Sequence, residues 1–171
     1  MIEARSATEL RQALAKSKGS HGFVPTMGFL HEGHLSLVRQ CRQENDFCSV
    51  SIFVNPTQFN DPNDLQTYPM DLEHDLASLR ELAVDLVYLP GDSDLYHRGS
   101  GNNRIWLVPE SLDDYLCGAS RPGHFRGVLT VVFKLFQQLQ PHRAYFGKKD
   151  YQQARLVEEM AETFFVPVTV R

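Results

Sequence analysis

The sequence has 171 residues, of which 42% are hydrophobic and 22% are charged, and its formal net charge is −4. A chain of this length typically forms one domain that buries a core without disulfides or structural metals. The composition excludes disordered and collagen-like classes. No cluster of Lys or Arg indicates a nucleic-acid surface, so we expect no nucleic-acid partner.

The sequence also argues against secretion and membrane insertion. No apolar stretch approaches the ~20 residues that a membrane-spanning helix needs. Residues 1–20 carry charges where a secretory signal would be apolar. The three cysteines, Cys41, Cys48 and Cys117, are odd in number and lack metal-ligand spacing. We therefore expect a cytoplasmic protein with reduced thiols and no membrane partner.

The first half of the chain alternates predicted helices and strands. A helix over residues 2–18, capped by Ser6 or Thr8, precedes a short buried strand over 23–25. A helix over 34–42 and a strand over 47–54 follow. The polar residues 55–69 predict a long loop, and loops of that length often carry function.

The second half continues the alternation. A helix over 71–83 and a strand over 85–89 come next, and the acids Asp71, Glu73 and Asp75 are interpreted as favourable helix-dipole charges. Residues 92–103 look irregular, residues 104–108 form a possible edge strand, and residues 109–118 a short helix. The last predicted elements are a buried helix within 123–140, a strand over 143–146, a helix over 150–164 and a strand over 166–170.

This alternation predicts an α/β fold, a Rossmann-like doubly wound parallel sheet with helices on both faces. We expect a single domain over residues 1–171, with strand order 3-2-1-4-5 and the strand over 23–25 in the centre. Ligands of such sheets bind at the carboxyl ends of the strands. Functional motifs should therefore follow strands directly.

One such motif, His31-x-Gly33-His34, comes directly after the first predicted strand. Gly28 and Gly33 allow the backbone to approach a ligand closely, and the following helix directs its N-terminus at the same place. Two imidazoles there can donate to phosphate oxygens. Zinc is the competing interpretation, but no Cys or third His lies near in the sequence.

A second motif, with the sequence GKKDYQQ, follows the strand over 143–146. Gly147 permits a tight exit from the strand, and a lysine there can reach a phosphate. Lys148 and Lys149 cannot both point inward, and spacing alone does not choose between them. Asp150 suits either a helix cap or a ribose hydroxyl, and Gln153 lies one helical turn further on.

Three further segments are candidates for ligand binding, although polar loops and turns would explain them equally well. The amides of Asn55 and Gln58, after the second strand, could bind hydroxyls or a carboxylate. His124 and Arg126 open the buried helix and could face an anion. Tyr68 ends the long loop and could act as a lid element.

Taken together, the segments PTMGFLHEGH, FVNPTQF, Tyr68-Pro69, RPGHFRGV and FGKKDYQQ resemble the pantothenate synthetase (pantoate–β-alanine ligase) family. This family belongs to the nucleotidyltransferase superfamily and shares the His-x-Gly-His motif with class I aminoacyl-tRNA synthetases. The resemblance covers essentially the whole chain. It does not extend to the family's C-terminal lid domain, which the sequence does not match. The chain is therefore expected to be the family's N-terminal nucleotide-binding domain, with impaired turnover.

The resemblance implies a two-step ligation. ATP and pantoate give pantoyl adenylate and pyrophosphate with Mg²⁺, and β-alanine then attacks the adenylate to release AMP and pantothenate. It also implies a homodimer. Two alternatives stay open: another nucleotidyltransferase with this motif, or a fragment that binds ligands without turnover. The neutral amides of Gln58 and Gln153 suit a small hydroxy acid better than a second nucleotide phosphate.

The resemblance further implies roles for individual residues. The catalytic residues would be His31, His34 and Lys149. ATP would be bound by Met27, Gly28, His31, Gly33, His34, Gly147, Lys149 and Asp150. Pantoate would be bound by Met27, Gln58 and Gln153, in a pocket lined also by Asn55, Tyr68 and His124. No protein metal ligand is implied.

Overall fold

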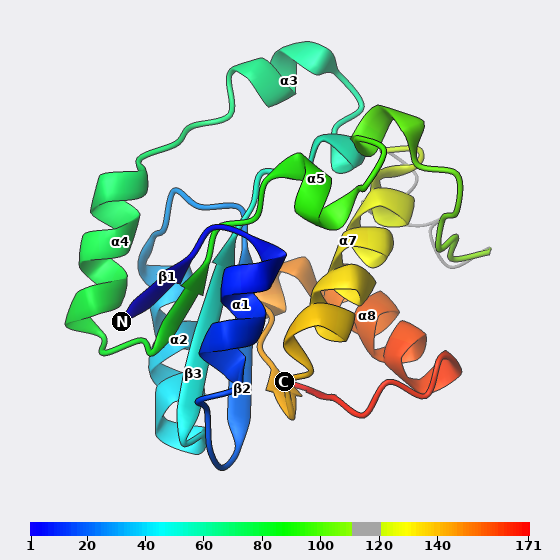
Figure 1. The fold of residues 1–171 in the computed structure, drawn as a ribbon. Helices are drawn as coiled ribbons and strands as arrows, with labels where there is room; N and C mark the ends of the chain where they lie inside the picture. Colours follow the sequence, from blue (N-terminus) through cyan, green and yellow to red (C-terminus); the bar gives the residue numbers. More distant parts are fainter. Residues whose placement is uncertain (111–120) are drawn as a thin grey trace.

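The fold is built on a six-stranded sheet with the order β1-β4-β3-β2-β5-β6 (Figure 1). The structure is a computed structural model that describes residues 1–110 and 121–171. Every pair of neighbouring strands is parallel. The strands are β1 (Ile2–Ala4), β2 (His21–Thr26), β3 (Phe47–Ile52), β4 (Leu86–Tyr88), β5 (Arg143–Ala144) and β6 (Thr169–Val170).

Helices cover both faces of this sheet, and the pleat of the strands explains why. Successive side chains of a strand point to opposite faces, so Phe23 and Val24 of β2 enter two different apolar clusters. The Phe23 cluster contains the buried faces of α1 (Ala7–Leu14), α7 (His124–Leu139) and α8 (Tyr151–Thr163). The Val24 cluster contains those of α2 (Glu32–Glu44) and α4 (Leu72–Glu81). The predicted α/β class with a doubly wound parallel sheet is therefore confirmed.

The predicted strand order needs one correction. The five predicted strands follow one another as expected, but β1 lies beyond them at the edge, where Ile2 pairs with Leu86 of β4. The apolar pattern had predicted a helix over 2–18 that includes these residues. The helix instead begins at Ala7, after Ser6, whose side chain accepts from the Glu9 N–H. The sequence pattern did not predict β1 as a strand because it has only three residues and Ile2 is 43% exposed at the sheet edge.

Other boundaries differ more locally. The possible strand over 104–108 is not a strand: Ile105 is 84% exposed, and the Leu107 N–H donates to the Thr130 hydroxyl of α7. The predicted helix over 109–118 lies largely outside the described residues. The loop over 55–69 contains η1 (Pro56–Gln58) and α3 (Pro62–Gln66). Residues 92–103 contain α5 (Asp92–Leu95) and η2 (Ser100–Asn102), and η3 (Lys148–Asp150) precedes α8.

No helix in the described part of the chain combines the length and apolar character that a membrane span requires. Cys41 and Cys48 are both buried and unpaired, and Cys117 lies outside the described residues. The neighbouring Cys48 thiol and burial both raise the pKa of Cys41. This thiol is therefore a core side chain rather than a reactive one.

Candidate active site

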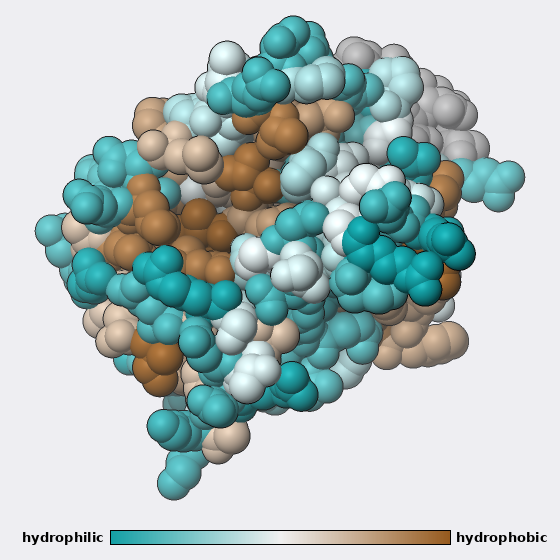
Figure 2. All heavy atoms as spheres, turned by 45° about the horizontal axis from the view of Figure 1, so that its top comes forward, coloured by the Kyte–Doolittle hydropathy of each residue, from teal (hydrophilic) through white to brown (hydrophobic). Residues whose placement is uncertain are grey.

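A cavity of about 160 Å³ lies where β2, β3 and β5 end. Figure 2 turns the carboxyl ends of the strands toward the viewer, and apolar side chains gather there around a hollow with a hydrophilic rim. The polar and predicted residues that line the cavity are Thr26, Met27, His34, Asn55, Gln58, Tyr68, Asp150 and Gln153. Segments far apart in the sequence therefore meet where a doubly wound sheet binds its ligands.

The turn after β2 has an unusual backbone. Gly28 has a φ of +84° and Phe29 a φ of +53°, so two successive residues are left-handed. A side chain at position 28 would be strained at this φ, and its Cβ would lie 3.0 Å from the Asp75 carboxylate. Gly28 is therefore required by the turn itself. Its N–H donates to the Thr26 hydroxyl at 3.2 Å.

The two histidines of the motif cap α2 and contact each other. His31 is the N-cap residue, and its Nδ1 accepts from the Gly33 N–H at 3.1 Å. The Nδ1 atom of His34 accepts from the His31 N–H at 3.4 Å, and the two ring centroids are 4.2 Å apart. A ring nitrogen that accepts a hydrogen bond carries no proton, so each neutral imidazole has its proton on Nε2. Both rings thus keep one N–H donor.

His34 is held neutral by its surroundings. Burial and then the charge of His31 lower the pKa of His34, with a smaller contribution in the same direction from Lys149. Asp75 and Asp150 act in the opposite direction. The result is a neutral hydrogen-bond donor at the wall of the cavity near neutral pH.

Asn55, after β3, is fully used by internal hydrogen bonds. Its Oδ1 accepts from the Thr57 hydroxyl and the Tyr96 hydroxyl, at 3.0 and 2.9 Å. Its Nδ2 donates to the Gln58 side-chain oxygen and to the Gly127 carbonyl, both at 3.2 Å. Its role in the fold is therefore to orient Gln58, and little of its amide remains for a ligand.

Gln58 is fixed on three sides. Its Nε2 lies 2.7 Å from the Met27 sulfur, and the His124 Nδ1 lies 2.9 Å from its backbone carbonyl. A Cβ on Gly127 would come within 2.3 Å of the Thr57 carbonyl, so only glycine lets α7 approach η1 this closely. His124 thus lies behind Gln58 and is not among the residues that line the cavity. Arg126, the other residue predicted to face an anion, lies over the Trp106 ring, with its guanidinium carbon 4.5 Å from the ring centroid.

The segment after β5 contributes Asp150 and Gln153 to the cavity. Asp150 is at the N-cap position of α8, but its side chain makes no capping hydrogen bond, so of the two roles open to it the structure does not support the side-chain cap. Lys149 is exposed, yet close enough to influence His34. A Cβ on Gly147 would meet nothing within 4 Å, and its φ of −73° suits any residue. The fold itself therefore does not require glycine at position 147.

Several predicted residues are not among those that line the cavity: Gly28, His31, Gly33, His124, Gly147 and Lys149. Sequence motifs did not indicate the apolar floor of the cavity, which is formed by Pro25, Phe53, Val128, Val131, Val132, Leu135 and Phe146. The apolar pattern of residues 123–140 indicated burial but not which side chains face a cavity. From sequence, Asp75 was interpreted only as a favourable charge for the helix dipole, although its carboxylate accepts hydrogen bonds from the turn after β2.

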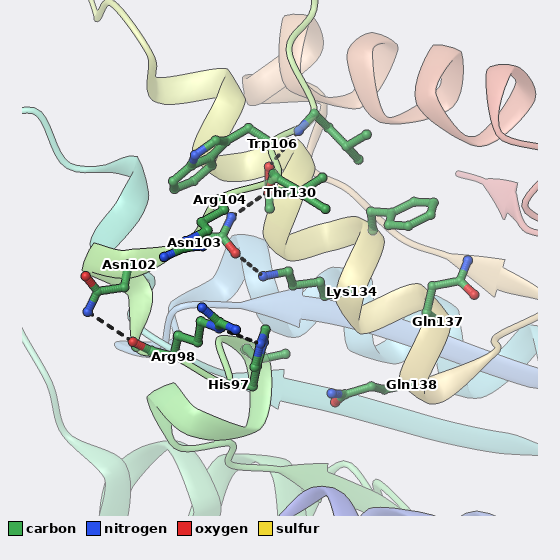
Figure 3. A pocket seen from close by; sticks show the side chains of 15 residues that line it. His97, Arg98, Asn102, Asn103, Arg104, Trp106, Thr130, Lys134, Gln137 and Gln138 are labelled. Atoms are coloured by element: carbon green, nitrogen blue, oxygen red, sulfur yellow. Dashed lines mark hydrogen bonds between the residues drawn. The ribbon is translucent and has the colours of Figure 1, made fainter.

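A larger groove of about 590 Å³ lies on the other side of α7 (Figure 3). Lys134 projects into it, donating to Asn103 Oδ1 at 3.2 Å and lying 3.8 Å from the Tyr96 ring centroid. The groove shares no lining residue with the cavity, and no residue of the two motifs lines it. The cavity at the strand ends is therefore the candidate site.

The model of the pantoate-beta-alanine ligase family matches residues 3–171. This chain belongs to that family. It is 51% identical over 167 residues to the pantothenate synthetase of Exiguobacterium sibiricum, covering 98% of this chain and 59% of that protein. It is 54% identical over 151 residues to the pantothenate synthetase of Thermosipho melanesiensis, covering 88% of this chain and 52% of that protein.

Solved structures of the family agree with the fold. The pantoate-beta-alanine ligase of Francisella tularensis, complexed with beta-gamma ATP and beta-alanine, matches with a TM-score of 0.95 and 44% identity. This match covers 100% of this chain and 66% of that one. The pantothenate synthetase of Thermus thermophilus matches with a TM-score of 0.92 and 47% identity, and this match covers 100% of this chain and 60% of that one. The chain thus spans 59% of the length of the Exiguobacterium relative.

Proposed function

We propose that this chain carries the nucleotide-binding and adenylate-forming site of a pantoate–β-alanine ligase. In the first step a carboxylate oxygen of pantoate attacks the α-phosphorus of ATP, and the bond to pyrophosphate breaks. In the second step the β-alanine amine attacks the acyl carbon, the bond to AMP breaks, and the nitrogen loses a proton. Family membership supports the proposal, as does the relative solved with beta-gamma ATP and beta-alanine.

The observation that carries the proposal is the convergence of His34, Gln58 and Gln153 on one cavity. They come from three separate strand ends, and one is a neutral donor while two are amides. A phosphate and a small hydroxy acid need these two kinds of partner. The chain thereby supplies orientation and electrostatics rather than a covalent nucleophile.

His31, His34 and Lys149 are proposed to act on the phosphates. The two imidazoles each keep an Nε2–H donor, and they lie at the N-terminus of the 13-residue helix α2. That terminus favours negative charge. Lys149 adds a mobile positive charge that offsets the charge growing on the α-phosphate and the pyrophosphate. Met27, Gly28, Gly33, Gly147 and Asp150 are proposed to contact the nucleotide.

Gln58 and Gln153, with Met27, are proposed to hold pantoate. Asn55 Nδ2 donates to the Gln58 side-chain oxygen, so the Gln58 amide has one orientation. A fixed amide can donate to a carboxylate without placing a competing charge in the site. Tyr68 is proposed to close the same pocket, and Asn55 and His124 to support it from behind Gln58.

Mg²⁺ is proposed to arrive with the nucleotide. Magnesium in nucleotide sites is commonly held by substrate phosphates with few protein carboxylates. Among residues 1–110 and 121–171, no group of three or more His, Cys, Asp or Glu side chains could hold a metal ion. The ion is therefore proposed to be held mainly by the phosphates.

Three further properties belong to the same proposal. Residues 1–171 act as one nucleotide-binding domain, the protein works in the cytoplasm, and it forms a homodimer. The unpaired thiols of Cys41 and Cys48 are consistent with a reducing compartment. Sedimentation equilibrium tests the homodimer directly, and a monomer at micromolar concentration would contradict it.

The test is pantoate-dependent exchange of pyrophosphate into ATP, measured together with calorimetric binding of ATP and of pantoate. Gln58→Glu should abolish pantoate binding because it places a carboxylate against a carboxylate. Gln137→Glu, at an exposed site in the groove of Figure 3, is the matched control and should leave it unchanged.

The possible outcomes separate the alternatives. Exchange that does not need pantoate would replace the proposal with another nucleotidyltransferase. Binding of ATP and pantoate without exchange would show a chain that binds without turnover, which its 59% span of the Exiguobacterium relative makes the second candidate. Failure to bind either ligand would contradict both.

A further inference from the structure

Asp75 differs from the other acids at the start of α4. Asp71 caps the helix by accepting from the His74 N–H, and Glu73 is exposed. The Asp75 side chain points into the protein and the residue is 1% exposed. A carboxylate that leaves water needs partners that replace its hydration.

Those partners are backbone amides of the turn after β2. Asp75 Oδ2 accepts from the Phe29 N–H at 2.8 Å, and Oδ1 accepts from the Leu30 N–H at 2.7 Å. In the described part of the chain, no Lys, Arg or His forms an ion pair with this carboxylate. Both oxygens are thus committed to one short stretch of backbone more than 40 residues away in the sequence.

The turn needs such support. Gly28 and Phe29 are both left-handed, and Phe29 is a residue that adopts this conformation rarely. The Phe29 side chain is 51% exposed, so burial does little to hold it in place. Leu30 is 7% exposed and is the one strong apolar anchor of the turn. The carboxylate satisfies two amides that would otherwise point into the protein without acceptors.

The turn leads directly into the histidine motif. His31 follows Leu30 and begins α2, and the His31 N–H in turn donates to His34. The Asp75 carboxylate is therefore linked to the His34 imidazole through the β2–α2 turn and two successive hydrogen bonds. The Asp75 charge also reaches His34, where it opposes burial and His31 by raising the pKa.

We propose that Asp75 is a positioning residue, whose carboxylate holds the β2–α2 turn in the shape that places His31 and His34 at the cavity. Asp75 itself acts through the histidines and not on a ligand, because it is buried and does not line the cavity. Calling the histidines nucleotide-binding rests on the proposed function. The claim that Asp75 holds the turn in place does not rest on the proposed function, and a separate measurement tests it.

The experiment compares Asp75→Asn with Glu73→Gln, a matched loss of one charge from the same helix turn. In ¹H–¹⁵N spectra of the 171-residue chain, Asp75→Asn should shift the Phe29 and Leu30 amides, because an amide side chain offers one acceptor where the carboxylate offers two. The His34 imidazole should titrate at lower pH, since Asp75 no longer opposes burial, His31 and Lys149 there, although Asp150 still does. ATP with Mg²⁺ should bind about tenfold more weakly, as expected for an unsatisfied buried amide. Glu73→Gln should change none of these.

Two further variants guard against misfolding and a merely structural role. Asp75→Glu keeps the charge but moves it by one methylene, so it should shift the two amides and weaken ATP binding. Because the charge is kept, His34 should titrate closer to its wild-type pH in Asp75→Glu than in Asp75→Asn. In a His34→Ala background, Asp75→Asn should weaken ATP binding less than in the wild type, because one of the two positioned groups is already gone.

Each outcome decides the matter. A lower melting temperature with unchanged Phe29 and Leu30 amides and an unchanged His34 titration would overturn the proposal. Full additivity with His34→Ala would overturn it as well. Shifted amides and titration in a chain that binds no ATP would support the positioning role and contradict the proposed function.

Discussion

The His31 N–H donates to Nδ1 of His34 over 3.4 Å, so the backbone of one histidine sets the tautomer of the other. Nδ1 of His31 is in turn engaged by the Gly33 N–H. The remaining donor of each neutral ring is therefore Nε2–H. A pair of imidazoles whose Nδ1 atoms are both engaged, one of them in a ring held neutral by burial, is suited to donate hydrogen bonds to a phosphate as its charge increases.

Removing the His34 donor should slow adenylate formation with little effect on the fold. His34→Ala should cost roughly 2–4 kcal/mol of transition-state stabilisation, the range for loss of one preorganised donor. The measurement is pantoate-dependent ATP–pyrophosphate exchange, and His74→Ala, at an exposed site on α4, is the control. Unchanged exchange kinetics in His34→Ala would remove His34 from the mechanism.

Asn55 should affect the acid substrate through Gln58. Asn55→Asp keeps the acceptor for Thr57 and Tyr96 but loses the donor to the Gln58 oxygen. A carboxylate against that oxygen should turn the Gln58 amide, and pantoate should bind about tenfold more weakly while ATP binding changes little. Calorimetry measures both, with the exposed Asn63→Asp as control. Equal losses for ATP and pantoate would indicate general disruption instead.

Gly147 separates a requirement of the fold from one of the ligand. Gly147→Ala should leave stability unchanged or raise it by about 0.4–1 kcal/mol, because its φ of −73° suits alanine and its Cβ would meet nothing within 4 Å. ATP binding should nevertheless weaken if the nucleotide approaches this backbone closely. Gly101→Ala, where a Cβ also meets nothing within 4 Å, is the matched control. Wild-type affinity in Gly147→Ala would place the nucleotide elsewhere.

His21 should make stability depend on pH. Burial, followed by the charge of His142, lowers the pKa of His21 to about 4 from its ordinary value of 6.5. The unfolded chain therefore binds a proton between these values that the folded chain does not, so stability falls as the pH drops from 6.5 toward 4. From pH 7 to pH 5 the loss due to His21 should be about 2 kcal/mol.

Urea unfolding at the two pH values measures this loss. His21→Gln can still hydrogen-bond to Ser49, whose hydroxyl lies 2.7 Å from His21 Nε2, and it should reduce the loss by about that amount. The exposed His74→Gln should not. An undiminished pH dependence in His21→Gln would show that other groups cause it.

The sequence by itself determined the fold class, the relative order of five strands and the segments that carry the chemistry. Alternating helical and strand periods imply parallel strands with crossovers, and parallel strands bring their carboxyl ends to one edge of the sheet. His34, Gln58 and Gln153 follow three of those strands, so their convergence could be predicted without coordinates. Family motifs then indicated the substrates.

Only the tertiary structure decided which polar groups are free and which support others. Asn55 and Asp75 are as polar in sequence as Gln153 and Asp150, yet internal hydrogen bonds occupy the first two. β1 became visible only through its pairing with β4. Local patterns report the period and polarity of a segment, whereas hydrogen-bond partners distant in the sequence are set by packing, and that packing separates a binding group from its support.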